Sequence, residues 1–181
     1  MRGYKVIILI VGGTGVLAWL LFGFFGVQAL FMDQRIQETV PNLIPATEMG
    51  SSTSPSSMQD EARLAVGEGA FVQGDSTYRI SGTGTIFQEE GGMKLALTDF
   101  EVTNGPDLYV YLVDAPSADN TAVKTAVADG KFVSLGRLKG NIGNQVYALP
   151  ENTDAEKKVI SIWCKRFSRN FGSALIQSFA Q

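Results

Sequence analysis

NGPDLYVYLV, residues 104–113, is the stretch that decides the fold. Its first half is a turn signal in which Gly105 and Pro106 interrupt any regular element. Its second half alternates two rows of apolar side chains, which are Leu108, Val110 and Leu112 on one face and Tyr109, Tyr111 and Val113 on the other. A strand that is apolar on both faces is expected at the centre of a sheet, with packing partners on both sides.

The sequence on either side of this strand repeats the same pattern of short apolar runs between turn residues. Clusters of Gly, Asn, Asp and Pro recur about every ten residues, and the runs between them are rich in Val, Ile, Tyr, Phe and Thr. This pattern is typical of all-β domains. We expect an antiparallel β-sandwich or barrel with strands at residues 70–72, 78–80, 84–88, 93–102, 108–113, 132–135, 145–148, 159–165 and 173–177. Residues 122–128 are compatible with either a short helix or a strand.

One of these strands changes its buried face along its length. Leu95 and Leu97 share one parity, whereas Phe100 and Val102 share the other. A β-bulge near Asp99 is the simplest explanation, because one extra residue restores the inward direction of the apolar side chains. Asp99 is therefore expected to have a structural role, with a ligand-binding role as the alternative.

Two absences limit the chemistry. The chain has no histidine and one cysteine, Cys164. These counts exclude a Ser-His-Asp triad, a His-ligated zinc, copper or haem site, an intramolecular disulfide and a CxxC redox pair. The net charge of -3 offers no basic surface for a phosphate backbone, so nucleic acid is not expected as a partner.

Residues 6–32 contain no charged side chain, and a helix of that length reaches about 40 Å, beyond a hydrocarbon core of about 30 Å. This predicts one transmembrane helix ahead of the β domain. Arg2 and Lys5 precede the run and Asp33 and Glu38 follow it, which places the N-terminus in the cytoplasm and the domain outside.

A cleaved signal peptide is the alternative, because residues 27–29 resemble a small-residue cleavage site. We favour a retained anchor because the apolar run is longer than that of a usual signal peptide. The expected organisation is a cytoplasmic tip and anchor at residues 1–33, a flexible Ser/Thr/Pro-rich stalk at residues 34–65 and a β domain at residues 66–181. The protein is thus expected to be a single-pass membrane protein with an extracytoplasmic domain.

Cys164 continues an apolar row formed by Ile160 and Ile162. A free cysteine in such a row is usually a small buried apolar side chain. The alternative is a reactive thiol, for which the adjacent Lys165 and Arg166 offer modest help, because Lys165 points to the other face of the strand.

Tyr109, Tyr111, Asp99 and Asp107 are candidates for a ligand groove. Phenol rings in a row suit sugars and planar molecules, although packing under a neighbouring loop is the more common reason for two such tyrosines. The loop carboxylates, with Asp114, are more typical of turns than of a hydrolytic or calcium site. No metal site is expected.

A series of short motifs follows in order along the domain: GAF (69–71), SGTG (81–84), LALTDF (95–100), NGPDLYVYL (104–112), LGRLKG (135–140), GNQVY (143–147) and IWCKRF (162–167). This order resembles that of the DM-thirteen domain, which is found beside DOMON domains and is labelled an electron-transfer module. The resemblance implies an extracytoplasmic β domain whose single cysteine, here Cys164, has a suspected redox role.

Two functions follow, and the sequence leaves both open. The first is a redox module in which Cys164 acts with a partner protein of the cell envelope, since one thiol alone completes no two-electron cycle. The second is a non-enzymatic binding or scaffold module in which Cys164 is a core residue. A resident haem of the DOMON kind is not expected, because it would need His or Met ligands, and the chain has no His and only Met93 within the domain. No cofactor is therefore predicted, and enzymatic activity of its own is the less favoured interpretation.

Overall fold

The computed structural model describes residues 13–17, 19, 33–45, 63–151, 153 and 158–179. The first of its two sheets contains β1 (Leu43–Pro45), β2 (Arg63–Ala70), β4 (Ile80–Glu89), β5 (Gly92–Val102), β8 (Gln145–Ala148) and β11 (Gln177–Ser178). The second contains β3 (Val72–Gln73), β6 (Leu108–Val113), β7 (Phe132–Arg137), β9 (Val159–Cys164) and β10 (Arg169–Leu175). The helix α2 (Asn120–Ala128) joins β6 to β7.

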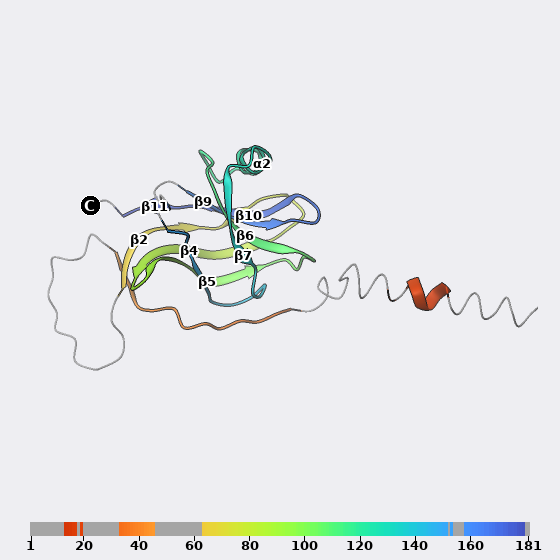
Figure 1. Ribbon diagram of the computed structural model, residues 1–181, viewed down its shortest axis with the longest axis horizontal. Coiled ribbons are helices and arrows are strands. Elements are labelled where there is room, and N and C mark those ends of the chain that lie inside the picture. Colours follow the sequence, from red (N-terminus) through yellow and green to blue (C-terminus); the bar gives the residue numbers. More distant parts are fainter. Residues whose placement is uncertain are drawn as a thin grey trace, which may run out of the picture.

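The two sheets pack face to face as a β-sandwich (Figure 1). The first has the strand order β1-β2-β4-β5-β8, with β11 also paired to β2, and the second has the order β3-β10-β9-β6-β7. Neighbouring strands are antiparallel except for β1 and β2, which are parallel. The predicted all-β sandwich is confirmed, and the region left open at residues 122–128 is helical.

The core between the sheets, called here the inter-sheet core, is formed by inward side chains of both sheets. It includes Leu95, Leu97 and Phe100 from β5, and Val110, Ile160 and Phe171 from the second sheet. Most of these side chains are fully buried, and burial of this kind stabilises a fold by roughly 1.5–3 kcal/mol for each large apolar side chain.

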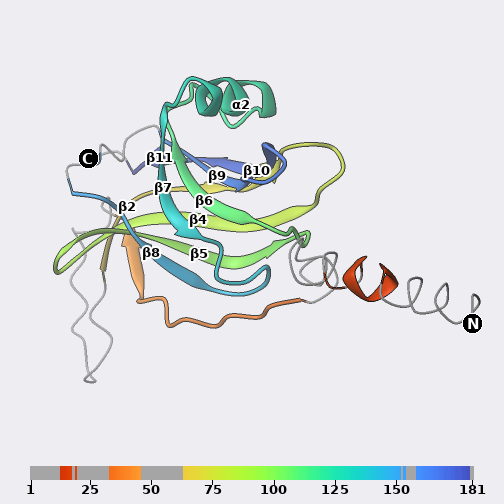
Figure 2. The same cartoon turned by 45° about the vertical axis from the view of Figure 1, so that its right-hand side comes forward.

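A second cluster, called here the helix-covered cluster, lies on the outer face of the second sheet. Its buried members are Tyr111, Val113, Ala115, Val123, Ala126, Val159 and Trp163. Helix α2 closes this face, as Figure 2 shows. Strand β6 lies between β9 and β7 and is covered on both faces, so the prediction of a central strand is confirmed.

The change of face in β5 is a bulge at Asp99. Ser81 pairs with Glu101 and Thr83 pairs with Thr98, so two residues of β5 oppose one residue of β4. Asp99 has a positive φ of 49°, which fits the extra residue of a bulge. Leu97 and Phe100 therefore both point into the inter-sheet core.

Residues 33–45, called here the strap, lie in extended form along the first sheet (Figure 2). The main-chain N–H of Ile36 donates to Ile142 O at 2.9 Å, and that of Glu38 donates to Asn144 O at 3.0 Å. At its other end the strap becomes β1 and pairs with β2. One segment therefore contacts both edges of the first sheet.

The predicted single-pass location needs correction. Within the predicted anchor, the described residues are 13–17 and 19, and they are helical. Among the described residues, no helix combines the length and apolar character that crossing a membrane requires. The remaining residues of 1–32 lie outside the described ranges, and so do residues 46–62 of the expected stalk.

Candidate functional site

Cys164 is the last residue of β9 and points into the inter-sheet core. Its exposed fraction is 0%, and it forms no disulfide. Its register partner on β6 is Leu108, which belongs to the same core. The turn at residues 165–168, which joins β9 to β10, begins directly after it.

At the Cys164 sulfur, burial and the charge of the Asp107 carboxylate raise the pKa of the thiol, whereas main-chain hydrogen bonds lower it. Burial is the largest effect and raises the pKa of the thiol, because a thiolate loses its hydration there. Hydrogen bonding from the main-chain N–H groups of Phe167, Arg166 and Asp107 lowers the same pKa. Since the raising effect prevails, the resting side chain at neutral pH is a protonated thiol.

Tyr109 and Tyr111 lie on the opposite face of β6 from Cys164. Tyr111 is 5% exposed, and its ring stacks on Phe132 and Trp163 at centroid distances of 4.4 and 6.3 Å. Burial is the main cause that raises its pKa. Tyr111 is thus a packing residue of the helix-covered cluster.

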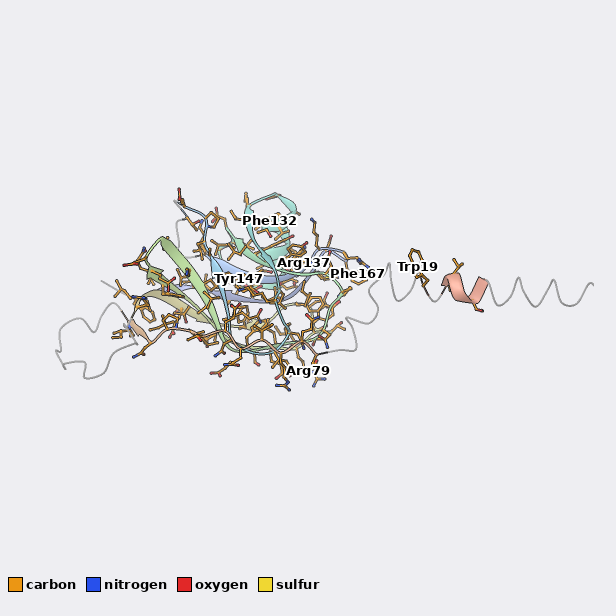
Figure 3. The ribbon with its side chains drawn as sticks, turned by 60° about the horizontal axis from the view of Figure 1, so that its bottom comes forward. Trp19, Arg79, Phe132, Arg137, Tyr147 and Phe167 are labelled. Carbon is orange, nitrogen blue, oxygen red and sulfur yellow. The ribbon has the colours of Figure 1, made fainter. Side chains whose placement is uncertain are left out.

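Tyr109 is half-buried and lies between two cations. Its ring centroid is 5.7 Å from the guanidinium carbon of Arg137 and 5.6 Å from Lys165 Nζ. Lys165 therefore points to the face opposite Cys164, as predicted. Figure 3 shows Arg137 and Phe167 toward the same end of the domain, where Phe167 is 56% exposed.

The two carboxylates predicted for a groove lie in different environments. Asp107 accepts a 2.6 Å hydrogen bond from Arg137 Nη2, which holds the pKa of that guanidinium above its usual value. Asp99 is exposed at the bulge, where its main-chain N–H donates to Asn144 Oδ1 at 3.1 Å. The structure therefore groups Asp107 with Tyr109 through Arg137, and it places Asp99 beside Asn144 at the bulge.

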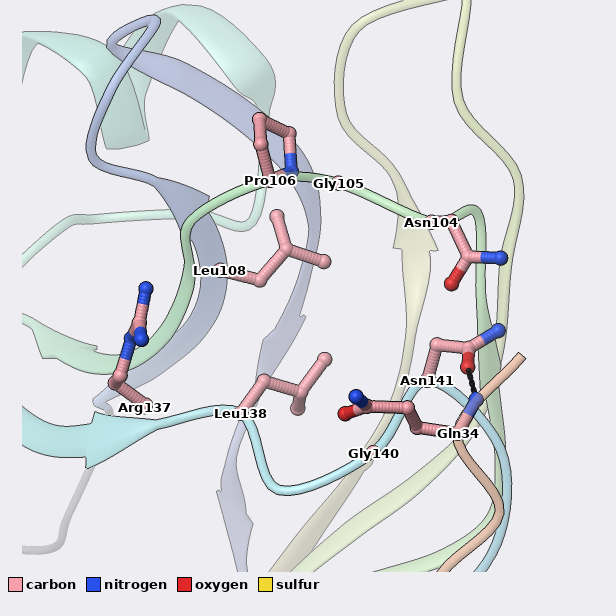
Figure 4. Close-up of a pocket in the computed structure, with 9 residues that line it drawn as sticks. All are labelled: Gln34, Asn104, Gly105, Pro106, Leu108, Arg137, Leu138, Gly140 and Asn141. Carbon is pink, nitrogen blue, oxygen red and sulfur yellow. Dashed lines mark hydrogen bonds between the residues drawn. The ribbon is translucent and has the colours of Figure 1, made fainter. Parts of the chain in front are cut away.

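A cavity of about 180 Å³ lies at the cysteine end of the sandwich (Figure 4). Leu108 and Leu138 form its apolar floor, while Arg137, Asn104, Asn141 and Gln34 form its polar wall. Leu108 links this cavity to Cys164, its register partner.

Sequence reasoning missed this polar wall, because loop residues such as Asn141 follow no periodic pattern. The 7% exposed fraction of Asn141 becomes visible only in the folded chain. The turn signal at Gly105 and Pro106 was the sole local indication of a cavity here. Within the described ranges, no cluster of three or more Cys, Asp or Glu side chains is suited to hold a metal ion.

Comparison with protein families gives one match. The model of the family described as Electron transfer DM13 matches residues 71–176, which is more than half of the chain and most of the sandwich. Searches of curated proteins and of solved structures give no match. The matched range contains Cys164, the turn after it and Leu108, so it covers the thiol and its surroundings. The chain therefore belongs to the Electron transfer DM13 family.

Proposed function

We propose that this domain is a redox accessory module whose Cys164 forms a mixed disulfide with a cysteine of a partner protein. The observation that carries the proposal is that main-chain N–H groups of Phe167, Arg166 and Asp107 lower the pKa of the Cys164 thiol, against the larger effect of burial. N–H groups held in this way form a small cradle for negative charge, and a thiolate needs such a cradle when it forms inside a protein. Membership of an electron-transfer family supports the same conclusion.

The proposed step is thiol–disulfide exchange. The Cys164 thiol loses its proton and attacks one sulfur of a disulfide in the partner. A new bond joins Cys164 to that sulfur as the partner's own S–S bond breaks. The departing partner sulfur is reduced and takes up the proton, whereas Cys164 is oxidised.

Burial of the thiol means that this reaction requires local opening. The segment over the sulfur is the turn at residues 165–168, whose four residues are all exposed. A short exposed turn opens at a lower free energy than a whole sheet does. We therefore expect the partner to make contact at this turn, beside the exposed ring of Phe167.

The second candidate is a non-enzymatic binding module in which Cys164 is only a core residue. The complete burial of Cys164 and the prevailing rise of its pKa favour this alternative. The two candidates differ in one measurable quantity, which is the free energy of the opening that exposes the sulfur.

Alkylation kinetics on the full chain separate the candidates. A matched control carries Ala174→Cys in a Cys164→Ser background, because Ala174 is also fully buried in the inter-sheet core but lies within β10. In native protein, we expect Cys164 to react at least tenfold faster than the thiol that the control carries at position 174. In denaturant the two thiols should react at the same rate. Equal native rates would mean that Cys164 is exposed only by global unfolding, and the redox proposal would then be wrong.

A further inference from the structure

The strap is held by two carboxylates, and each occupies a separate site. At the first site, Asp33 Oδ1 accepts hydrogen bonds from Asn104 Nδ2 at 2.8 Å and from Asn141 Nδ2 at 3.0 Å. These bonds lower the pKa of Asp33, with the Asn141 bond as the larger cause. Asn141 Oδ1 accepts from the main-chain N–H of Gln34 at 2.6 Å, so this amide binds both a side chain and the main chain of the strap (Figure 4).

The second site binds Glu38. Its two carboxylate oxygens lie 2.7 and 2.8 Å from Lys139 Nζ, and one of them accepts the main-chain N–H of Val146 at 2.7 Å. The hydrogen bond from Lys139 is the main cause that lowers the pKa of Glu38. Lys139 is fixed in turn by Val146 O at 2.7 Å and by the ring of Tyr147.

The main chain between the two sites is bound in the manner of an added strand. Arg35 forms a parallel bridge with Ile142, and the N–H groups of Ile36 and Glu38 donate to residues 142 and 144. Gly143 has a φ of +104°, and a Cβ atom there would overlap the carbonyl oxygen of Ile36. The opposing segment is therefore shaped for close approach of an extended chain.

We propose that this groove, formed by Asn104 and residues 139–146, is a peptide-binding site for an extended acidic segment of a partner protein, and that the strap is its internal ligand. The recognised pattern has a carboxylate at its first position and another at its sixth, as Asp33 and Glu38 have. Strand addition supplies the sequence-independent part of the binding, while the amide pair and Lys139 select the two carboxylates.

The strap is suited to being replaced in the groove by a segment of such a partner. Asp33, Gln34 and Arg35 are exposed, and the side chains of Lys139 and Glu38 are 39% and 36% exposed. Water reaches both side chains of this ion pair and partly screens it, so a competing carboxylate can take the place of Glu38. Because the strap is covalently connected to the domain, its effective concentration at the groove is high, and a partner segment must bind well enough to compete with it.

Binding of a labelled peptide with the sequence of residues 33–38 tests the proposal by fluorescence anisotropy. We compare the unaltered full chain with an Asp33→Asn/Glu38→Gln variant, whose own strap is weakened. We expect the variant to bind the peptide at least tenfold more tightly, because its groove is vacated. A peptide with Asn and Gln in place of its two carboxylates is expected to lose at least tenfold in affinity.

Two further variants complete the test. Gln37→Ala keeps both carboxylates and should behave as the unaltered chain does. Lys139→Gln, added to the double variant, should weaken the preference for the acidic peptide by removing the part that the second carboxylate contributes, while the part due to Asn104 and Asn141 remains. If circular dichroism shows that the double variant is unfolded, each single variant replaces it, with an expected gain of about threefold.

Two results would overturn the proposal. One is equal affinity for the acidic and the neutral peptide. The other is an unaltered chain that sediments as a dimer and dissociates on addition of the peptide, because the groove would then belong to the strap of a second copy. None of these readouts depends on Cys164, so the redox proposal and this one succeed or fail separately.

Discussion

The two faces of β6 are buried to the same degree but are closed by different kinds of structure. On one face, Val110 is 0% exposed in the inter-sheet core. On the other, Val113 is also 0% exposed, but it lies in the helix-covered cluster. A hydrogen-bonded sheet closes the first face, whereas the second is closed by a helix of nine residues with no side-chain N-cap bond. Equally buried side chains on the two faces are therefore expected to lose different amounts of folding free energy when they are truncated.

The largest expected effect concerns Phe171 in the inter-sheet core. Its ring is 2% exposed and stacks on Tyr78 at a centroid distance of 3.7 Å. We expect Phe171→Ala to lower the free energy of unfolding by about 3–5 kcal/mol, because two sheets cannot close around the cavity. Urea unfolding followed by circular dichroism measures this loss. A loss below about 1 kcal/mol would mean that the two sheets do close around the cavity, contrary to this expectation.

The matched pair Val110→Ala and Val113→Ala tests the comparison itself. Both changes remove the same atoms from fully buried sites on one strand. We expect a loss of roughly 2–3 kcal/mol for Val110 and roughly 1–2 kcal/mol for Val113, because α2 can settle into the smaller cavity and a sheet cannot. The same unfolding assay measures both. A larger loss in the free energy of unfolding for Val113→Ala than for Val110→Ala would contradict the comparison.

Cys164→Ser introduces a hydroxyl group into the inter-sheet core. The main-chain N–H groups near the sulfur keep an acceptor, but the hydroxyl meets apolar neighbours such as Leu108 and Ile162. We expect a loss of about 1–3 kcal/mol in the free energy of unfolding, with the domain still folded. Near-ultraviolet circular dichroism verifies the fold. If stability were unchanged, the thiol would contribute nothing to core packing.

The smallest effect concerns pH and the strap. The pKa of Glu38 is lowered in the folded chain, so its contribution is complete above the ordinary value of 4.5 and is lost as the pH falls through the lowered value. We expect faster hydrogen exchange at the amides of Ile36 and Glu38 under acid conditions, after correction for intrinsic rates. The core amides of β6 should keep their protection. A strap that loosened with rising pH would contradict the assigned charge states.

Local patterns predicted the parts of the fold that depend on neighbours in sequence. The alternation in residues 108–113 identified a strand buried on both faces, and the change of parity in β5 located the bulge at Asp99. Residues 122–128 were ambiguous, because a stretch of this length shows too little periodicity to separate helix from strand. Its helical state is fixed by contact of Val123 and Ala126 with the second sheet.

The strap and the cavity at the cysteine end were not predictable in the same way. Glu38 and Lys139 are separated by 101 positions, and Asp33 and Asn141 by 108. No local pattern contains such pairs, and a polar segment before a domain is typical of a linker. Cys164 itself was recognised from its apolar row, but the N–H groups that lower its pKa belong to the turn at residues 165–168 and to Asp107, which is distant in sequence.

The strap also has a consequence for the order of folding. Its residues 33–38 precede every strand of the two sheets in the chain, yet their partners at residues 139–146 are synthesised more than 100 positions later. Closing so long a loop lowers the chain entropy before any contact between the strap and its partners forms. Docking of the strap is therefore expected among the last and slowest steps of folding. Until then the edge of the first sheet beside residues 142–144 and the part of β2 that pairs with β1 remain open to pairing with other chains, and the nascent domain is most prone to aggregation during this interval.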